Sequence, residues 1–263
     1  MLLNQNKILL LFCITLFISC DDSNNTVKNS DDIPVTIENK NGETDYKMEV
    51  DSNSSIHVID KKDGSTEKGL LVQSKRNGVW KVFDKSKVLS NVYYYYNDSL
   101  LYVLDKNDYN FVRYNVNGSL SILKPKNWEV YPNTNNKQIL ASFQKPVTNN
   151  VNFFTPLINI QSDSLQKSNS FEDYVNHEVQ SLNNNSTFKL MSIKEYGIGN
   201  YKATQATYII IVNDIKLGVV TSWINKGKAI YIINCMASNE NKGDFLHYKE
   251  LFQDILLSCE INN

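Results

Sequence analysis

Few reactive side chains of this sequence stand at the spacing that a catalytic or metal site requires. The histidines, at His57, His177 and His247, are isolated, and none has a second histidine or a cysteine at metal-ligand spacing. His177-Glu178 lacks the second histidine of the zinc-protease motif, since position 181 is Ser181. No serine lies in a Gly-x-Ser-x-Gly turn. We therefore expect no metal, no cofactor and no enzymatic activity.

The cysteines are the other reactive side chains. Cys235 lies in an apolar run typical of a buried strand, where a thiolate is disfavoured. Cys259 continues the apolar stripe of the last predicted helix, so its thiol is expected to face the sheet. The sequence leaves open whether a disulfide joins Cys235 to Cys259, because it does not give the distance that a bridge requires.

The N-terminus has the pattern of an export signal that ends at Cys20. One basic residue, Lys7, precedes an apolar run over residues 8–18. A helix needs about 20 residues to span a bilayer, so this run is too short to do so. Its length fits the apolar core of a signal peptide. Phe17-Ile18-Ser19-Cys20 resembles the lipobox of bacterial lipoproteins. The resemblance implies that residues 1–19 are a signal peptide and that Cys20 carries lipid.

Polar and acidic residues follow the predicted lipidation site, beginning with Asp21-Asp22-Ser23-Asn24-Asn25. This start resembles the export tags of Bacteroidetes surface lipoproteins, which implies an outer-membrane lipoprotein that is periplasmic or surface-exposed. Loss of Lys7 with the signal changes the formal net charge from −1 to −2, so no excess of positive charge favours nucleic acid. The expected partners are the membrane, through the lipid, and a protein.

Two segments of different composition follow. Residues 20–55 are rich in Asn, Asp, Ser and Lys, which predicts a flexible tether. Residues 56–122 alternate Val-, Tyr- and Phe-rich runs with turn signals such as Asp63-Gly64 and Asn117-Gly118. The spacing of these turns predicts an antiparallel β-meander.

Within this meander, Lys75-Arg76-Asn77-Gly78-Val79-Trp80 resembles the repeat core of MORN-type proteins and of the YwqK-like antitoxin family. The resemblance implies a tight turn at Asn77-Gly78 and aromatic side chains that stack on one face of a single-layer sheet. Trp80, Tyr94 and Tyr96 are the candidate residues of a partner-binding surface.

Residues 123–263 combine helical and strand patterns. Two apolar stripes with helical spacing, at Phe171–Leu182 behind the cap Ser170 and at Phe245–Ser258, predict amphipathic helices. Four β-rich runs between them predict an antiparallel sheet, at Phe188–Tyr196, Lys202–Val212, Gly218–Ile224 and Ala229–Ala237. The predicted class is α+β, with helices that are segregated from the sheet.

The order of these elements, with Lys126-Asn127-Trp128 on an early strand and Ser258-Cys259 after the last helix, resembles the PsbP-like family. DcrB-type envelope lipoproteins belong to this family. The resemblance implies an αβα sandwich that has no catalytic site of its own and acts in scaffolding or binding.

Three functions follow from these patterns. The first is a non-catalytic binding or accessory lipoprotein of the cell envelope. The second is an immunity lipoprotein that neutralises a secreted toxin, which the antitoxin-like repeat implies. The third is a hydrolase with dispersed carboxylates, and against it stands the position of the acidic residues at predicted turns, where Asp is favoured. These residues are Asp63, Asp84, Asp105, Asp108 and Asp214.

Overall fold

The computed structural model describes residues 35–131, 138–147, 154–165, 170–184, 187–240 and 244–262. The chain forms two compact units, the first ending at Lys106 and the second beginning at Asn107. The predicted signal peptide and Cys20 lie outside the described residues. No helix in the described part of the chain is long and apolar enough to cross a membrane.

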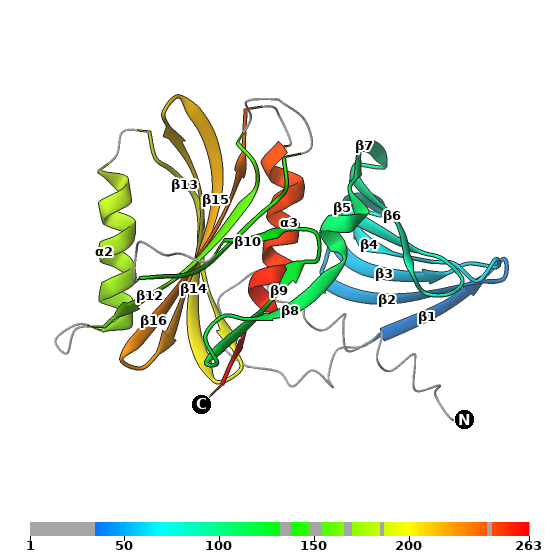
Figure 1. Cartoon of the computed structure of the whole chain (residues 1–263). Coiled ribbons are helices and arrows are strands. Elements are labelled where there is room, and N and C mark those ends of the chain that lie inside the picture. Colours follow the sequence, from blue (N-terminus) through cyan, green and yellow to red (C-terminus); the bar gives the residue numbers. More distant parts are fainter. Residues whose placement is uncertain are drawn as a thin grey trace. The chain divides into compact units, whose positions relative to one another are not determined.

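The first unit is a seven-stranded antiparallel sheet, sheet A, in which each strand pairs with the next along the chain (Figure 1). Turns that contain a residue with positive φ separate most neighbouring strands, for example Asn97 and Asp98 between the last two. The strands are β1 (Val35–Lys40), β2 (Glu43–Asp51), β3 (Ser54–Asp60), β4 (Thr66–Val72), β5 (Lys75–Phe83), β6 (Leu89–Tyr96) and β7 (Ser99–Leu104).

Residues 35–51, predicted as part of the tether, form β1 and β2 instead. The reason is an apolar cluster on one face of the sheet, in which Met48 of β2 is buried with Ile56 and Val58 of β3. Tyr46 and Val50 pack against this cluster. Alternate residues of β2 therefore bury apolar surface that a composition average over residues 20–55 conceals.

The tight turn predicted at Asn77-Gly78 is not a turn. Both residues lie inside β5, and the register with β4 shifts between Lys68 and Leu70, opposite this point. Gly78 has φ of 69°, as a β-bulge residue often has. The hairpin turn lies earlier, at Gln73 and Ser74, which both have positive φ.

The second unit contains a seven-stranded sheet, sheet C, in the order β10-β11-β12-β16-β15-β14-β13, and a three-stranded sheet in the order β17-β9-β8. The strands of sheet C are β10 (Glu129–Tyr131), β11 (Ile139–Gln144), β12 (Leu157–Ser164), β13 (Lys189–Ile198), β14 (Tyr201–Val212), β15 (Ile215–Lys226) and β16 (Ala229–Ser238). The small sheet contains β8 (Phe111–Asn115), β9 (Leu120–Pro125) and β17 (Glu260–Ile261), and a 3₁₀ helix, η2 (Lys106–Tyr109), precedes it.

Two helices cover opposite faces of sheet C (Figure 1). Phe171 and Val175 of α2 (Phe171–Asn183) share a buried cluster with Val219 of β15. Phe245 of α3 (Asp244–Leu257) packs directly on Gly218, the preceding residue of β15. Because successive strand residues point to opposite faces, these contacts place one helix on each side. The predicted α+β class and its two segregated helices are confirmed.

Strands β8 and β9, predicted within the meander of residues 56–122, belong to the second unit. β9 pairs with β17 through Leu120 and Ile261, and this pairing joins it to the last strand of the chain. Leu120 and Ile122 are fully buried. A pairing partner about 140 residues away is invisible to local pattern, so the boundary between the units shifts from residue 122 to residue 106.

Candidate functional site

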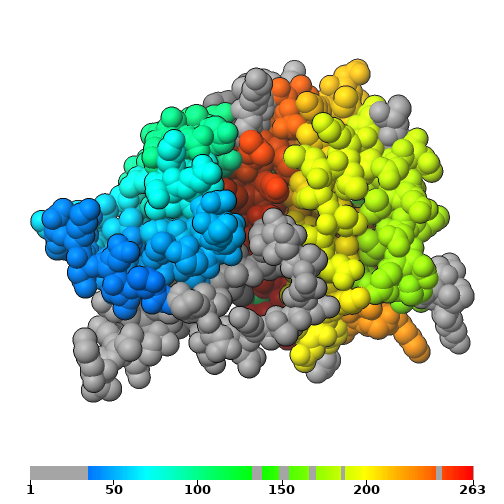
Figure 2. Space-filling view, turned by 180° about the vertical axis from the view of Figure 1, so that it is seen from behind, coloured from blue at the N-terminus to red at the C-terminus, as the bar shows by residue number. Residues whose placement is uncertain are grey.

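One face of sheet A carries a row of polar side chains that lie side by side on neighbouring strands. The registers place Lys47 of β2, His57 of β3 and Gly69 of β4 side by side in one row. The Trp80 ring of β5 lies over Gly69, because a Cβ added there would stand 2.3 Å from Trp80 Cδ2. We call this side, which also carries Asp45, the polar face. The edge strand β1 of this sheet is largely exposed, and it is the blue segment in Figure 2.

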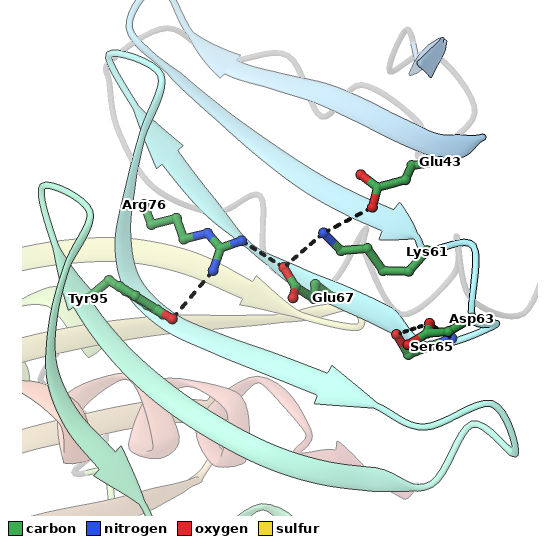
Figure 3. A network of polar contacts seen from close by, with 7 residues as sticks. All are labelled: Glu43, Lys61, Asp63, Ser65, Glu67, Arg76 and Tyr95. Atoms are coloured by element: carbon green, nitrogen blue, oxygen red, sulfur yellow. Dashed lines mark hydrogen bonds and ion pairs between the residues drawn. The ribbon is translucent and has the colours of Figure 1, made fainter. Parts of the chain in front are cut away.

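A ladder of charged side chains, joined by hydrogen bonds and ion pairs, crosses this face (Figure 3). Arg76 of β5 donates to Glu67 Oε2 of β4 at 2.8 Å and lies 3.4 Å from Tyr95 Oη of β6. Its guanidinium stacks on the rings of Trp80 and Tyr95, at 4.6 and 5.3 Å from their centroids. On the other side, Lys61 bridges Glu67 and Glu43, at 3.8 and 3.5 Å. The alternating charges neutralise one another, which suits cross-strand cohesion.

A second polar group on this face has the geometry of a proton relay. His57 Nδ1 lies 2.7 Å from Asp45 Oδ2, and His57 Nε2 lies 2.9 Å from Ser55 Oγ. Ser55 and His57 are buried, and the second carboxylate oxygen, Asp45 Oδ1, is buried with no hydrogen-bond partner among the described residues. We call these three residues the Ser-His-Asp group.

Sequence reasoning missed this group for two reasons. Asp45 fell within the predicted tether, and it stands 12 positions from His57, which appeared isolated. The one signal in the sequence is Ser55-Ile56-His57, because residues two apart on a strand share a face. Only the pairing of β2 with β3 reveals the third member.

The three aromatic residues predicted as a binding surface do not form one. Trp80 is only 1% exposed and donates its Nε1–H to the Leu70 carbonyl. The register pairs Trp80 with Tyr93, so Tyr94 and Tyr96 point to the opposite face of the sheet. Tyr94 packs against Tyr102 of β7. Of the three, Tyr96 alone is well exposed, at 62%.

Next to Tyr96, the edge strand β7 carries exposed apolar side chains that the sequence prediction did not single out. Leu100, Leu101 and Val103 are 49%, 51% and 69% exposed. Within sheet A, β7 hydrogen-bonds to β6 alone. We call Tyr96, Leu100, Leu101 and Val103 the β7 edge.

The remaining predicted site residues have structural roles. Cys235 and Cys259 are buried free thiols, so the disulfide that the sequence left open is not formed. Burial raises the pKa of both thiols, which disfavours the reactive thiolate. Asp63 and Asp84 accept hydrogen bonds from backbone N–H groups two residues on, as their turn positions predict.

Asp108 does not match the simple turn role predicted for it. It is 3% exposed, accepts a hydrogen bond from Trp128 Nε1 at 2.9 Å, and pairs with Lys145 Nζ at 2.5 Å. Lys145 also reaches Tyr248 Oη of α3, at 3.2 Å. This buried ion pair ties η2, the segment after β11, and α3 together. Within the described ranges, no cluster of three or more His, Cys, Asp or Glu residues could hold a metal.

The fold and these sites define a sheet-rich chain of two units, with one polar face, one apolar strand edge and two helices flanking the second sheet. The sequence matches no protein-family model, and no curated protein matches it.

Solved structures resemble it in outline. Cyanobacterial PsbP (CyanoP) from Synechocystis is 12% identical with a TM-score of 0.45 and covers 58% of this chain and 92% of its own. LpqN of Mycobacterium tuberculosis, involved in cell envelope biogenesis, is 14% identical with a TM-score of 0.44 over 55% of this chain and 83% of its own. The immunity protein TplEi of the T6SS from Pseudomonas aeruginosa is 9% identical with a TM-score of 0.33 over 84% and 73%. At such values these likenesses assign no function to this chain.

Proposed function

We propose that this chain is a lipid-anchored envelope protein that binds a protein partner through the β7 edge. The observation that carries the proposal is the composition of that edge. Ser99-Leu100-Leu101-Tyr102-Val103-Leu104 contains no charged residue and no proline. Natural sheets protect their edges with such residues, because an unpaired apolar strand invites pairing with another chain.

The opposite edge of the same sheet shows the contrast. β1 carries Glu38 and Lys40 within Val35–Lys40, which are the charges that discourage strand addition. An extended segment of a partner could therefore add to β7, where backbone groups supply hydrogen bonds and Leu101 and Val103 supply apolar contact. The lipid on Cys20, still a prediction, would hold this edge near the membrane.

Site-specific photocrosslinking tests the proposal in the producing cells. A photoreactive residue at position 103 should form one major adduct with a partner protein, whereas the same residue at Ile37 on β1 should not. Leu101→Lys and Val103→Lys should weaken binding of that partner more than about tenfold, because each would bury an unpaired charge. Val88→Lys is the matched control, since Val88 is 61% exposed in the turn before β6. Equal adducts at positions 37 and 103 would contradict the proposal.

The immunity hypothesis is a narrower form of the same proposal. If the partner captured at position 103 is a toxin, co-expression of this chain should protect a susceptible cell, and Val103→Lys should remove the protection. A partner without toxicity supports the accessory role instead. The expectation that the chain is not an enzyme stays a prediction, and the Ser-His-Asp group bears on it directly.

A further inference from the structure

The direction of the hydrogen bonds in the Ser-His-Asp group follows from elementary chemistry. An ionised Asp45 carboxylate has no proton to donate, so the proton between it and His57 belongs to Nδ1. A neutral imidazole then presents Nε2 as an acceptor, which leaves the Ser55 hydroxyl as the donor. The Ser55 hydroxyl is thus hydrogen-bonded to His57, a base that can take its proton, and the Asp45 carboxylate orients that base. Nucleophilic catalysis by serine needs this order of groups.

Two features around the group favour chemistry over mere packing. Asp45 Oδ1 is buried and lacks a hydrogen-bond partner among the described residues, a costly condition that native structures concentrate at reactive or liganded sites. The register between β2 and β3 shifts between Glu49 and Asp51, beside Ser55, and such bulges are frequent next to active sites.

We propose that Ser55 is an activated nucleophile that hydrolyses short-chain carboxylic esters, with His57 as the general base and Asp45 as a positioning residue. Ser55 is 8% exposed, which restricts the acyl group to a small one such as acetyl.

In the first step, the Ser55 Oγ–H proton passes to His57 Nε2 while Oγ bonds to the carbonyl carbon of the ester. The ester C–O bond then breaks, and the proton on Nε2 moves to the departing alcohol. Water next attacks the acyl-serine and gives its proton to Nε2. The bond between the acyl carbon and Ser55 Oγ then breaks, the proton on Nε2 returns to Oγ, and the carboxylic acid leaves. The Asp45 carboxylate stabilises the imidazolium that forms in both halves. No oxidant or metal takes part.

Active-site labelling of the full-length chain tests the proposal. A small alkyl fluorophosphonate should add one phosphonyl group, seen as a single mass increment on intact protein, and peptide mapping should place it on Ser55. Ser55→Ala should abolish this label. Ser54→Ala is the matched control, because Ser54 is the preceding residue of β3 and points to the opposite face; its label should be unchanged. Hydrolysis of 4-nitrophenyl acetate should follow the same pattern.

The roles of His57 and Asp45 are tested separately, through the rate at which Ser55 is labelled. His57→Gln should slow labelling on the order of 100-fold, the scale of general-base catalysis, whereas His177→Gln on α2 should not. Asp45→Ala should also slow it, and added formate should restore part of the rate by replacing the lost carboxylate, which a purely structural role would not allow. Circular dichroism of each variant establishes that it is folded. Labelling that persists in Ser55→Ala, or a folded wild-type chain that takes up no phosphonyl group, would overturn the proposal.

Discussion

Gly69 and Trp80 are packed so closely across β4 and β5 that the glycine has no room for a side chain. A Cβ at position 69 would stand 2.3 to 2.5 Å from three ring atoms of Trp80. The indole in turn donates to the Leu70 carbonyl at 3.2 Å and supports the Arg76 guanidinium. The contact between Gly69 and Trp80 therefore positions Arg76 in the ladder of charges. It also fixes the Trp80 ring on the polar face.

Gly69→Ala should destabilise the first unit by about 1–3 kcal/mol, because Trp80 must move to admit the methyl group. Urea unfolding followed by tryptophan fluorescence measures the change. Gly197→Ala on β13 is the control, since the nearest atom would lie 3.9 Å from its Cβ. If both variants unfold at the same urea concentration, the close packing of Gly69 and Trp80 is wrong.

Removing one member of the Asp108–Lys145 pair should strongly reduce the free energy of unfolding. Lys145→Met leaves the buried Asp108 carboxylate without its charge partner, and breaking such a pair costs about 3–5 kcal/mol. Lys202→Met breaks the exposed pair of Lys202 with Glu172, and it should cost far less stability because solvent screens that pair. Thermal unfolding of both variants compares the two. A similar loss from each would show that burial of Asp108 is not important for stability.

Removing the N-cap of α2 should cause a smaller loss of stability. Ser170 accepts a hydrogen bond from the Asp173 backbone N–H at 3.0 Å, and Asp173 Oδ2 accepts one from the Ser170 N–H at 3.2 Å, a reciprocal capping box. Ser170→Ala should cost about 1 kcal/mol. Ser181→Ala, at an exposed position inside the same helix, should cost nothing, because alanine favours helix. Chemical denaturation would disprove the capping role if the two variants behaved alike.

The buried thiols predict a pH dependence of stability. Burial raises the pKa of Cys235 well above the ordinary value of 9.0, and that of Cys259 is raised for the same reason. The folded state therefore keeps protons that the unfolded state loses, so this stabilisation is complete below about pH 9 and declines as the pH rises further.

Urea titrations at pH 8 and pH 10 measure this decline, and Cys235→Ala with Cys259→Ala should reduce it. Maleimide should leave both native thiols unmodified at pH 7 and modify both in urea. Rapid modification of the folded chain would contradict their burial.

Local sequence pattern predicted most elements of the second unit because their signals are local. The apolar stripe of α2 and its cap Ser170 lie within one segment, and the turn at Asn213 and Asp214 needs only residues that tolerate positive φ. The first unit was harder. The face of Trp80 depends on a bulge inside β5, and one shifted residue reverses which side chains are exposed.

By itself, the sequence determined the helices, the alternation of the strands, most turns and the lack of any catalytic motif readable along the chain, since each depends on residues a few positions apart. Tertiary structure alone decided that Asp45 meets His57 and Ser55, that Trp80 is buried, and that Cys235 and Cys259 stay unbridged. The physical reason is that strand register and side-chain packing set these contacts, and both are settled by burial over the whole sheet rather than by neighbours in the chain.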